Sequence, residues 1–416
     1  MVQKMRKMKD SGIEWIGDIP EGWEVVPIKR LCTMQAGKNL TSEQIAPEGT
    51  YPVYGGNGIR GFFSDYNCDG KFLIVGRQGA LCGNVHTVDG KVWATEHAVI
   101  TNPTNYVDID FLYYLLIGMD LNQYVSSTAA QPGLAVGTLL NLKTCYPCST
   151  LEQTQISNYL NAKYSEIDTM LSKTRSSIEE YKKLKQAVIT QAVTKGVRGE
   201  REMKDSGDPW LGQIPTEWKL SRVGLHFSII LGKMLCNTRL NDDYTLEPYY
   251  CAADVHFDGV STGERKKMWF SSSEKGLYLV QIGDLLVVEG GAGAGGSAIV
   301  TQQTSDTYVQ NSIMIVRSNG ISDNRYLRYL LESLVKQGYI DIVCNKATIP
   351  HFTKDKLSNV PFCVCPDGEQ KEIADYLDAK CAEIDRLIAK KEQLVKELEG
   401  YKKSLIYEVV TGKREV

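Results

Sequence analysis

The chain has 416 residues, of which 43% are hydrophobic, so it is long enough for two to three domains of about 150 residues, each with its own core. It carries 47 Lys and Arg against 50 Asp and Glu, a net charge of −3, which excludes a protein whose overall field attracts a polyanion or an acidic membrane. Nucleic-acid binding would have to depend on local patches. The longest apolar run, residues 111–118, is far below the roughly 20 residues of a spanning helix. No apolar signal segment follows the basic start, so we expect a soluble, cytoplasmic protein whose eleven scattered cysteines are reduced.

Two sequence motifs occur twice along the chain. MKDSGIEWIGDIPEGW at Met8 returns as MKDSGDPWLGQIPTEW at Met203, 195 positions later, with ten identities in sixteen positions. EQTQISNYLNAKYSEID at Glu152 returns as EQKEIADYLDAKCAEID at Glu369, 217 positions later, with ten identities in seventeen. The second copy is therefore 22 residues longer, and the sequences between the motifs differ. Such constant and variable blocks indicate one scaffold that carries two different recognition domains, with duplication and drift alone as the alternative.

The two variable blocks are predicted to be mixed α/β domains, at residues 1–150, which include the first constant motif, and at residues 200–367. In both, short β-rich runs alternate with Gly, Asn and Asp turn clusters. These runs are KFLIVG from Lys71, HAVIT from His97, DLLVV from Asp284 and SIMIV from Ser312. A short helix is predicted at residues 111–116 of the first block and at residues 326–334 of the second.

Each copy of the second motif opens a long predicted helix, at residues 151–199 and 368–416. Apolar or long-stemmed residues recur there at alternating spacings of three and four, which is typical of a helix that packs on a second helix. In the second helix they are Ile373, Leu377, Lys380, Ile384, Leu387, Lys391, Leu394, Leu398, Tyr401 and Leu405. The two seams can pair in an antiparallel coiled-coil rod of roughly 60 Å; packing of each helix on its own domain is the alternative. The predicted fold class is α+β, two mixed α/β domains joined by two long antiparallel helices in a pseudo-twofold internal repeat.

A glycine-rich segment of the second block matches a nucleotide-binding motif without its context. Gly291, Gly293 and Gly296 form GxGxxG after a predicted strand, whereas a dinucleotide site needs a helix next to hold the pyrophosphate. The following SAIVTQQT is predicted to be a strand. The segment lies within VEGGAGAGG at Val288, which weakly resembles VGRQGALCG at Val75 in the first copy. The first copy lacks the GxGxxG motif. We therefore interpret it as a hairpin or as a close backbone approach to a ligand.

Catalytic motifs are missing from the sequence. Cys145 and Cys148 form CYPC before a helix, where a redox dithiol would lie, but the second copy has Cys363 and Cys365, a spacing that fits neither this chemistry nor the usual zinc pairs. Buried structural thiols are the preferred interpretation. Five histidines stand singly, and no catalytic triad, HExxH motif or phosphate loop is present. The chain is predicted to be non-catalytic, with a redox or nucleotide-binding enzyme as the alternative.

Polar and basic side chains near predicted turns are candidates for DNA contact, because Arg reads guanine and Asn or Gln reads adenine through paired hydrogen bonds worth about 1 to 3 kcal/mol. In the first block they are Tyr54, Asn57, Arg60, Arg77 and Gln78. In the second block they are Arg265, Lys266, Lys267, Lys346 and His351. A solvated charged surface is the alternative for each of them.

The order of the blocks and three pairs of motifs resemble the specificity subunit of type I restriction-modification enzymes. The pairs are SGIEWIGDIPEGWEVVPIKRL with SGDPWLGQIPTEWKLSRVG, EQTQISNYLNAKYSEID with EQKEIADYLDAKCAEID, and LKQAVITQAVTKGV with YKKSLIYEVVTGK. The resemblance covers essentially the whole chain. It implies two target-recognition domains, each of which reads one half of a bipartite, asymmetric DNA site. It also implies an antiparallel helical rod whose length sets the spacer between the halves.

The resemblance further implies partners and cofactors. Two methylation subunits would dock along the helices, and restriction subunits would cut unmodified double-stranded DNA. The candidates for docking are Tyr159, Ile167, Tyr181, Tyr376, Ile384 and Tyr401. S-adenosylmethionine, ATP and Mg are expected on those partner subunits, and no cofactor or metal on this chain. Gln131 is a further DNA candidate, although its segment AAQPGLAVGTLLNL departs from the ATIPHFTKDKL that surrounds His351. A structural coiled-coil adaptor that binds proteins through its end domains is the rival function.

Overall fold

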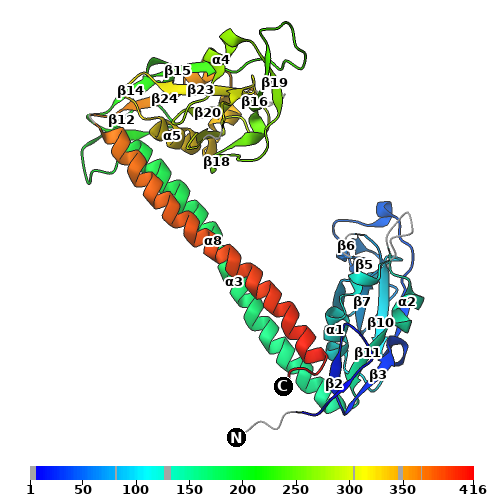
Figure 1. Ribbon diagram of the computed structural model, residues 1–416. Coiled ribbons are helices and arrows are strands. Elements are labelled where there is room, and N and C mark those ends of the chain that lie inside the picture. The colour runs from blue at the N-terminus through cyan, green and yellow to red at the C-terminus, as the bar shows by residue number, and fades with distance from the viewer. Residues whose placement is uncertain (1–5, 80–81, 126–132, 303–304, 345–349, 367) are drawn as a thin grey trace. The chain divides into compact units, whose positions relative to one another are not determined.

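The computed structural model describes residues 6–79, 82–125, 133–302, 305–344, 350–366 and 368–416. The chain divides into two compact units, in each of which runs of short strands precede the α-helices (Figure 1). Unit 1 comprises Met1–Arg175 and Glu392–Val416, and unit 2 comprises Ser176–Lys391. Each unit therefore combines one variable block with parts of both long helices.

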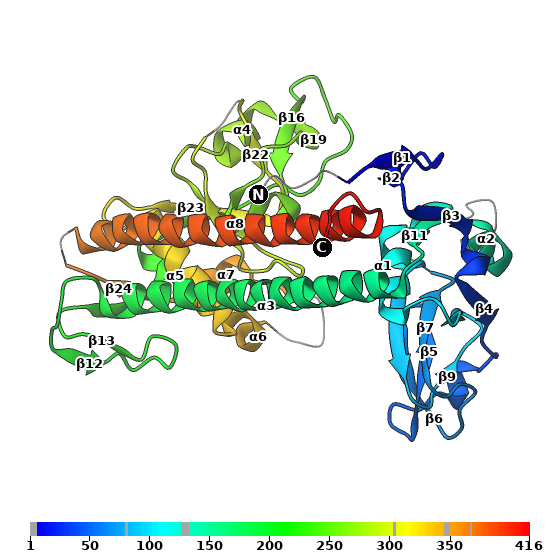
Figure 2. The same cartoon turned by 90° about the horizontal axis from the view of Figure 1, so that it is seen from below.

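Unit 1 contains a four-stranded sheet of order β4-β10-β7-β8 and a three-stranded sheet of order β6-β5-β9, while β1 pairs with β2 and β11 with β3. The strands are β1 (Met8–Asp10), β2 (Asp18–Pro20), β3 (Trp23–Pro27), β4 (Cys32–Ala36), β5 (Tyr51–Gly55), β6 (Gly58–Phe63), β7 (Lys71–Gly76), β8 (Val85–Asp89), β9 (Trp93–Ala94), β10 (Ala98–Pro103) and β11 (Lys143–Pro147). The short helices are α1 (Ile109–Gly118) and α2 (Val136–Asn141). In both views β5 and β6 lie at the end of unit 1 away from the long helices (Figure 2).

Unit 2 contains a four-stranded sheet of order β15-β23-β20-β21 and a three-stranded sheet of order β19-β16-β22, with the pairs β12-β13, β14-β24 and β17-β18. The strands are β12 (Met203–Asp205), β13 (Gln213–Pro215), β14 (Lys219–Arg222), β15 (Phe227–Leu231), β16 (Thr245–Tyr250), β17 (Val255–His256), β18 (Gly259–Val260), β19 (Lys267–Phe270), β20 (Leu285–Val288), β21 (Ser297–Ile299), β22 (Tyr308–Val309), β23 (Ile313–Ser318) and β24 (Pro361–Val364). The short helices are α4 (Ser272–Tyr278), α5 (Asn324–Lys336), α6 (Tyr339–Val343) and α7 (Lys354–Ser358).

The two units share one topology. Both four-stranded sheets have the same strand order, and in both three-stranded sheets the central strand runs parallel to the short third one. Helix packing repeats as well, since the Tyr114 hydroxyl donates to Asn161 (2.7 Å) and the Tyr329 hydroxyl donates to Asp378 (2.7 Å). The internal repeat and the mixed α/β content predicted from the sequence are therefore confirmed.

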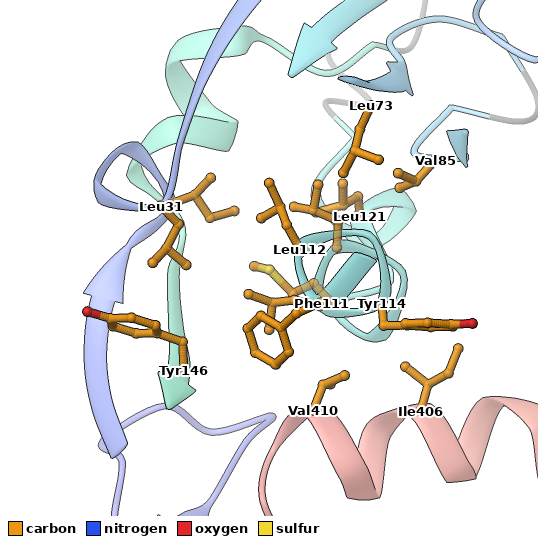
Figure 3. Close-up of a cluster of buried hydrophobic side chains, with 14 of the residues drawn as sticks. Leu31, Leu73, Val85, Phe111, Leu112, Tyr114, Leu121, Tyr146, Ile406 and Val410 are labelled. Atoms are coloured by element: carbon orange, nitrogen blue, oxygen red, sulfur yellow. The ribbon is translucent and has the colours of Figure 1, made fainter. Parts of the chain in front are cut away.

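Helix α1 forms the centre of the unit 1 core (Figure 3). Its first turn is capped by Asp108, whose side chain accepts a hydrogen bond from the amide of Phe111 (2.8 Å). Leu73 and Val85 cover α1 from the sheet side, and Val410 covers it from a long helix. Because α1 is apolar on both sides, it fastens the sheet to that helix. The predicted helix at residues 111–116 is confirmed, as is its counterpart α5.

Two long helices, α3 (Thr150–Lys195) and α8 (Glu369–Val410), each contribute to both units. Within unit 1, Asp168 of α3 forms an ion pair with Lys402 of α8 (2.6 Å). Within unit 2, Lys185 pairs with Asp385 (2.7 Å). In unit 1 the beginning of α3 therefore packs on the end of α8, and in unit 2 the end of α3 packs on the beginning of α8. None of the helices in the described part of the chain has both the length and the apolar character of a membrane span.

Three predicted seam positions of α8, Lys380, Leu394 and Tyr401, are exposed, and the residue after each of them is more buried. Leu394 and Tyr401 are exposed, whereas Val395 packs against the unit 1 core and Lys402 reaches across to α3. The spacing still alternates between three and four, so the heptad period was correct. The assignment of Leu394 and Tyr401 to the seam was wrong because Leu394 and Val395 are adjacent apolar residues, and the period alone does not choose between them.

Candidate nucleic-acid interface

The loops that connect the strands repeat the same backbone hydrogen bonds in both units. In unit 1 the backbone amides donate to backbone carbonyls as follows: Arg77 to His97 (2.9 Å), Leu134 to Arg77 (2.9 Å) and Thr95 to Tyr54 (2.9 Å). In unit 2 the corresponding bonds are Glu289 to Ser312 (2.8 Å), Phe352 to Glu289 (2.6 Å) and Gln310 to Tyr250 (3.1 Å). We call this surface the loop edge. It comprises residues 55–60, 77–79, 82–84, 95–97 and 133–134 of unit 1, and residues 251–254, 289–296, 310–312 and 350–352 of unit 2.

The glycine-rich segment is a hairpin loop of this edge. Gly79 and Gly291 both have a positive φ, of 90° and 86°, as do Gly83 and Gly295, of 92° and 82°. Gly79 and Gly83 thus correspond to residues 212 positions later in the chain. The weak resemblance between the segments at Val75 and Val288 had aligned them 213 positions apart. Strand β21 follows the second loop and pairs antiparallel with β20. The hairpin interpretation is therefore confirmed, and the helix that a dinucleotide site needs is replaced by a strand.

Three predicted DNA candidates of unit 1 line one open pocket of about 500 Å³, namely Asn57, Arg60 and Gln78. Asn57 and Arg60 are exposed, and the Asn57 side-chain oxygen accepts a hydrogen bond from the side-chain amide of Asn84 (2.9 Å). His97 also lines the pocket, although the sequence analysis did not select it. Its place at the start of the predicted run HAVIT, after a turn, was a signal that could have found it.

The remaining first-block candidates have other positions. Tyr54 is partly buried against the apolar cluster of β7 and β8, so it supports the loop edge from inside. The side chain of Arg77 donates to the carbonyl of Leu134 (3.2 Å) and thereby holds the chain segment that closes the domain. Gln131 and Lys346 lie outside the described residues.

Unit 2 presents a different set of groups at the same edge. His351 is 60% exposed, and its Nδ1 lies 3.5 Å from the carboxylate of Glu289. The His351 backbone forms a β-bridge with Gly290, in the position where Gly133 bridges Gln78 in unit 1. Glu289 was missed by the sequence analysis because the search concerned basic and amide side chains. The carboxylate of an acidic side chain is a hydrogen-bond acceptor, the type of group that pairs with the exocyclic amino group of cytosine.

The basic run lies in the longest insertion of unit 2. Arg265 stacks on the ring of Tyr250, with 4.0 Å between the guanidinium carbon and the ring centroid, and donates to the Ser261 carbonyl. Lys266 and Lys267 are exposed. Arg265 and Lys267 line an open pocket of about 680 Å³. Acidic residues, among them Glu247 and Glu264, line the same pocket, and the Arg265 side chain is already engaged within the chain.

Most of the extra length of the second copy is found here. Tyr54 corresponds to Tyr250 at an offset of 196, and Arg77 corresponds to Glu289 at an offset of 212. Sixteen of the 22 additional residues therefore lie between β16 and β20, where the small β17-β18 hairpin has no equivalent in unit 1.

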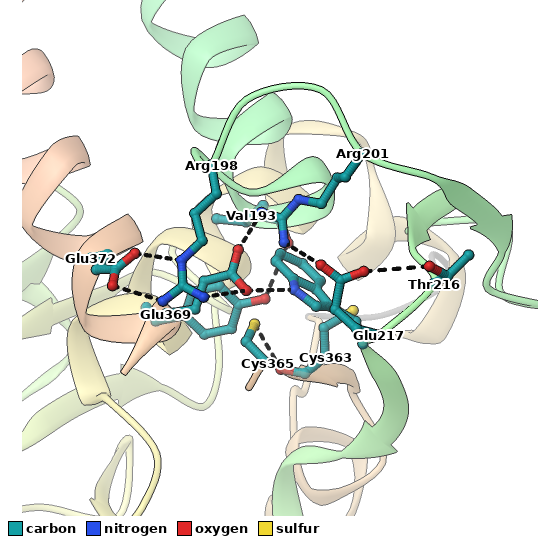
Figure 4. A network of polar contacts seen from close by, with 11 residues as sticks. Val193, Arg198, Arg201, Thr216, Glu217, Cys363, Cys365, Glu369 and Glu372 are labelled. Atoms are coloured by element: carbon teal, nitrogen blue, oxygen red, sulfur yellow. Dashed lines mark hydrogen bonds and ion pairs between the residues drawn. The ribbon is translucent and has the colours of Figure 1, made fainter. Parts of the chain in front are cut away.

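The two constant motifs meet in a buried polar clamp (Figure 4). In unit 2 the indole nitrogen of Trp218 donates to Glu369 (2.9 Å), and Arg201 forms an ion pair with the same carboxylate, which raises the pKa of Arg201. In unit 1, Trp23 donates to Glu152 in the same way (3.0 Å). The clamp explains why the repeated tryptophans and glutamates recur together, since they fix the start of each long helix to its recognition domain.

The helix candidates for partner binding differ in exposure. Ile167 and Ile384 are 5% and 6% exposed. We reassign these two from partner binding to packing within the chain, since a heptad position that faces the second helix is closed to a third protein. Tyr376 and Tyr401 are exposed, and Tyr159 and Tyr181 are partly buried. Exposed aromatic side chains suit an interface better than buried isoleucines do.

The cysteines have the properties of structural thiols. Cys145 and Cys363 are buried, and burial raises the pKa of each thiol to about 12. A redox dithiol needs a lowered thiol pKa, so CYPC does not have that character. Across the described residues no group of three or more His, Cys, Asp and Glu side chains is arranged to hold a metal.

Comparison with known proteins agrees with this architecture. A family model described as the type I restriction modification DNA specificity domain matches residues 20–180 and 215–397. The specificity subunit of the type I restriction enzyme EcoprrI of Escherichia coli is 45% identical over 121 residues, which are 28% of this chain and 30% of that protein. The putative type I restriction enzyme MjaX specificity subunit of Methanocaldococcus jannaschii is 25% identical over 429 aligned positions, covering 96% of this chain and 95% of that protein.

Two solved structures share the fold. A chain from a structure that concerns complex assembly and conformational transition of the type I R-M system has a TM-score of 0.71 at 16% identity, and the match covers 95% of this chain and 99% of that one. The HsdS subunit from Thermoanaerobacter tengcongensis has a TM-score of 0.53 at 16% identity, with 95% and 98% covered. These two likenesses concern the fold, and the two matches to the DNA specificity domain come from the family model. The chain belongs to the type I restriction-modification DNA specificity family, and it has the organisation of a specificity subunit.

Proposed function

We propose that this chain selects the DNA sequence for a type I restriction-modification complex, and that each unit reads one half of a bipartite, asymmetric site. The observation that carries the proposal is the loop edge. One backbone arrangement presents Asn57, Arg60 and Gln78 in unit 1, and Glu289 and His351 in unit 2. Because bases differ in the donors and acceptors of their major-groove edges, two such sets suit two different half-sites.

A second part of the proposal is that α3 and α8 form an antiparallel coiled-coil rod that sets the spacer between the half-sites. The facing pairs are Asp168 with Lys402 and Arg175 with Glu399 in unit 1, and Tyr181 with Lys391 and Lys185 with Asp385 in unit 2. In every pair the residue numbers sum to between 570 and 574. In an antiparallel pair of helices the residue number rises along one helix as it falls along the other, so a single register gives a nearly constant sum. The narrow range of sums supports one continuous rod.

The third part concerns partners. Two methylation subunits would dock on the exposed faces of α3 and α8, and restriction subunits would join them. S-adenosylmethionine, ATP and Mg would be held by those subunits, so this chain would contribute recognition and no catalysis. A chain with a net charge of −3 fits this division, because phosphate contacts supply most of the affinity for DNA and the partners can provide them.

An exchange of recognition blocks tests the proposal. Residues 32–150 are replaced by the matching block of a relative, the chain is produced with its methylation subunits, and the modified DNA is sequenced for methylated bases. We expect one half of the modified site to change and the other half to remain. The reciprocal exchange of residues 227–367 should change only the second half.

Two outcomes would contradict the two-reader model. If both half-sites change together, the units do not read separate sequences. If the complex modifies no defined site while the chain still captures protein partners through its units, the rival function of a structural adaptor is correct.

A further inference from the structure

A two-residue turn joins β5 and β6 into a hairpin at the loop edge of unit 1. Gly55 pairs with Gly58, and the turn residues between them are Gly56 and the exposed Asn57. Gly58, directly after the turn, has a φ of 96°, a left-handed conformation that glycine adopts readily. In Figure 2 this hairpin lies at the end of unit 1 away from α3. A two-stranded ribbon of this kind is narrow enough to enter the major groove of DNA, which is about 12 Å wide.

A β-bulge places Arg60 at the tip of this hairpin. Val53 pairs with Gly61 and Tyr54 pairs with Ile59, so Arg60 is the additional residue between the two pairs. A bulge turns the side chain of the additional residue out of the regular alternation. The stem of Arg60 lies directly over Gly55, at a distance where a Cβ on Gly55 would collide with it. Glycine at this position therefore allows the arginine to hold its place across the hairpin.

The tip offers hydrogen-bond donors. Among the described residues the Arg60 guanidinium makes no hydrogen bond and no ion pair, and an arginine has donors alone. The side-chain oxygen of Asn57 is occupied by Asn84, which leaves the Asn57 amide nitrogen as a further donor toward the pocket. Of the four bases, guanine alone presents two adjacent acceptors, O6 and N7, in the major groove.

We propose that Arg60 reads a guanine in the half-site of unit 1, by donating to its O6 and N7 from the major groove. The inference rests on the proposed function, because it assigns chemistry to the same loop edge. In unit 2 the matching register of β16 with β19 places Arg265 at the corresponding position, opposite Tyr250. That arginine stacks on the Tyr250 ring and donates to the Ser261 carbonyl, so its side chain is already engaged within the chain. The role is therefore specific to the first half-site.

Base analogues test this assignment in the complex with methylation subunits. The modified site of the unaltered complex is first determined by sequencing. Binding is then measured with duplexes in which each guanine of the first half-site is replaced in turn by 7-deazaguanine, which lacks N7, or by hypoxanthine, which keeps O6 and N7. At one position we expect 7-deazaguanine to weaken binding about 10-fold or more and hypoxanthine to have little effect. With Arg60→Gln the same 7-deazaguanine duplex should bind as the guanine duplex does.

Two further variants complete the test. Gly55→Ala keeps the arginine but displaces it, so it should lose the same discrimination. Arg30→Gln removes another exposed arginine, outside the loop edge, and should keep the discrimination. A first half-site without guanine would overturn the assignment. The assignment would also be overturned if the Arg60→Gln complex bound every duplex more weakly by the same factor and with a smaller salt dependence. That result would indicate that Arg60 contacts a phosphate instead of a base. If the unaltered complex modifies no bipartite site, the proposed function itself has failed.

Discussion

At the scale of single residues, Glu369 is a buried charged group of unit 2 that is held by partners from two other segments. Its side chain is fully buried, accepts from Trp218 and balances the charge of Arg201. Glu369→Gln keeps an acceptor for the indole but leaves a mostly buried guanidinium with a single carboxylate, that of Glu217 (2.6 Å). We expect unit 2 to lose about 2 to 4 kcal/mol of unfolding free energy. Hydrogen exchange under increasing urea would show this loss in unit 2, with unit 1 unchanged.

The matched control is Glu372→Gln, one helical turn further along α8. This carboxylate is 52% exposed and pairs with Arg198 (2.7 Å) at the surface. Because exposed ion pairs contribute about 0 to 1 kcal/mol, we expect a small effect. Equal losses in the two variants would show that the clamp does not fasten α8 to its domain.

The sequence predicted some residues of the loop edge and missed others for a physical reason. Asn57, Arg60 and Gln78 were found because turn glycines and side-chain chemistry mark them locally. His97 and Glu289 were missed because they reach the loop edge through backbone bonds between segments far apart in the chain. Arg77 was selected by its charge, but its bond to Leu134 gives it a structural role that no local pattern shows.

At the scale of elements, Gln153 connects three parts of unit 1. Its side-chain oxygen accepts from the amide of Asp108 (2.8 Å), before α1, and its nitrogen donates to the Pro147 carbonyl (2.9 Å), at the end of β11. Gln153→Leu would remove the side-chain partner of the buried Pro147 carbonyl and of the partly buried Asp108 amide, and a buried polar group left without a partner costs about 1 to 3 kcal/mol. We expect α1 to exchange its amide hydrogens faster in this variant, as measured by hydrogen exchange.

Gln155→Leu, at an exposed position two residues away, is the control and should leave the exchange of α1 unchanged. Gln370 makes the equivalent bonds to Asp323 (3.0 Å) and Cys363 (3.2 Å) in unit 2, so Gln370→Leu should act on α5 alone. If Gln153→Leu also accelerates exchange in α5, the effect is not local and the assignment is wrong.

The elements themselves were largely predictable, because hydrophobic period and turn residues are local signals. Both long helices, α1, α5 and the strand-rich blocks were found in this way. The seam of α8 was only half correct, since Leu394 and Val395 are both apolar and α3 decides which of them is covered. The parallel pairing of β5 with β9 was also not predictable, because pairing partners depend on the closure of the whole domain.

At the scale of the whole molecule, the proposed rod predicts that helix length sets the spacer of the DNA site. Seven residues inserted after Arg175 in α3 and seven after Lys391 in α8 would preserve the heptad seam and lengthen each helix by about 10 Å. At 3.4 Å per base pair this corresponds to about three base pairs. We therefore expect methylated sites whose half-sites are unchanged and whose spacer is about three base pairs longer, as read by sequencing of the modified DNA.

The control for this experiment is insertion into one helix alone. It shifts one seam against the other by two turns and should reduce modification without creating a new spacer, because the facing residues no longer match. A paired insertion that is folded and active but modifies sites with the original spacer would refute the rod as the spacer-setting element. The loop edges would still read their half-sites in that case, since block exchange and helix length act on different parts of the chain.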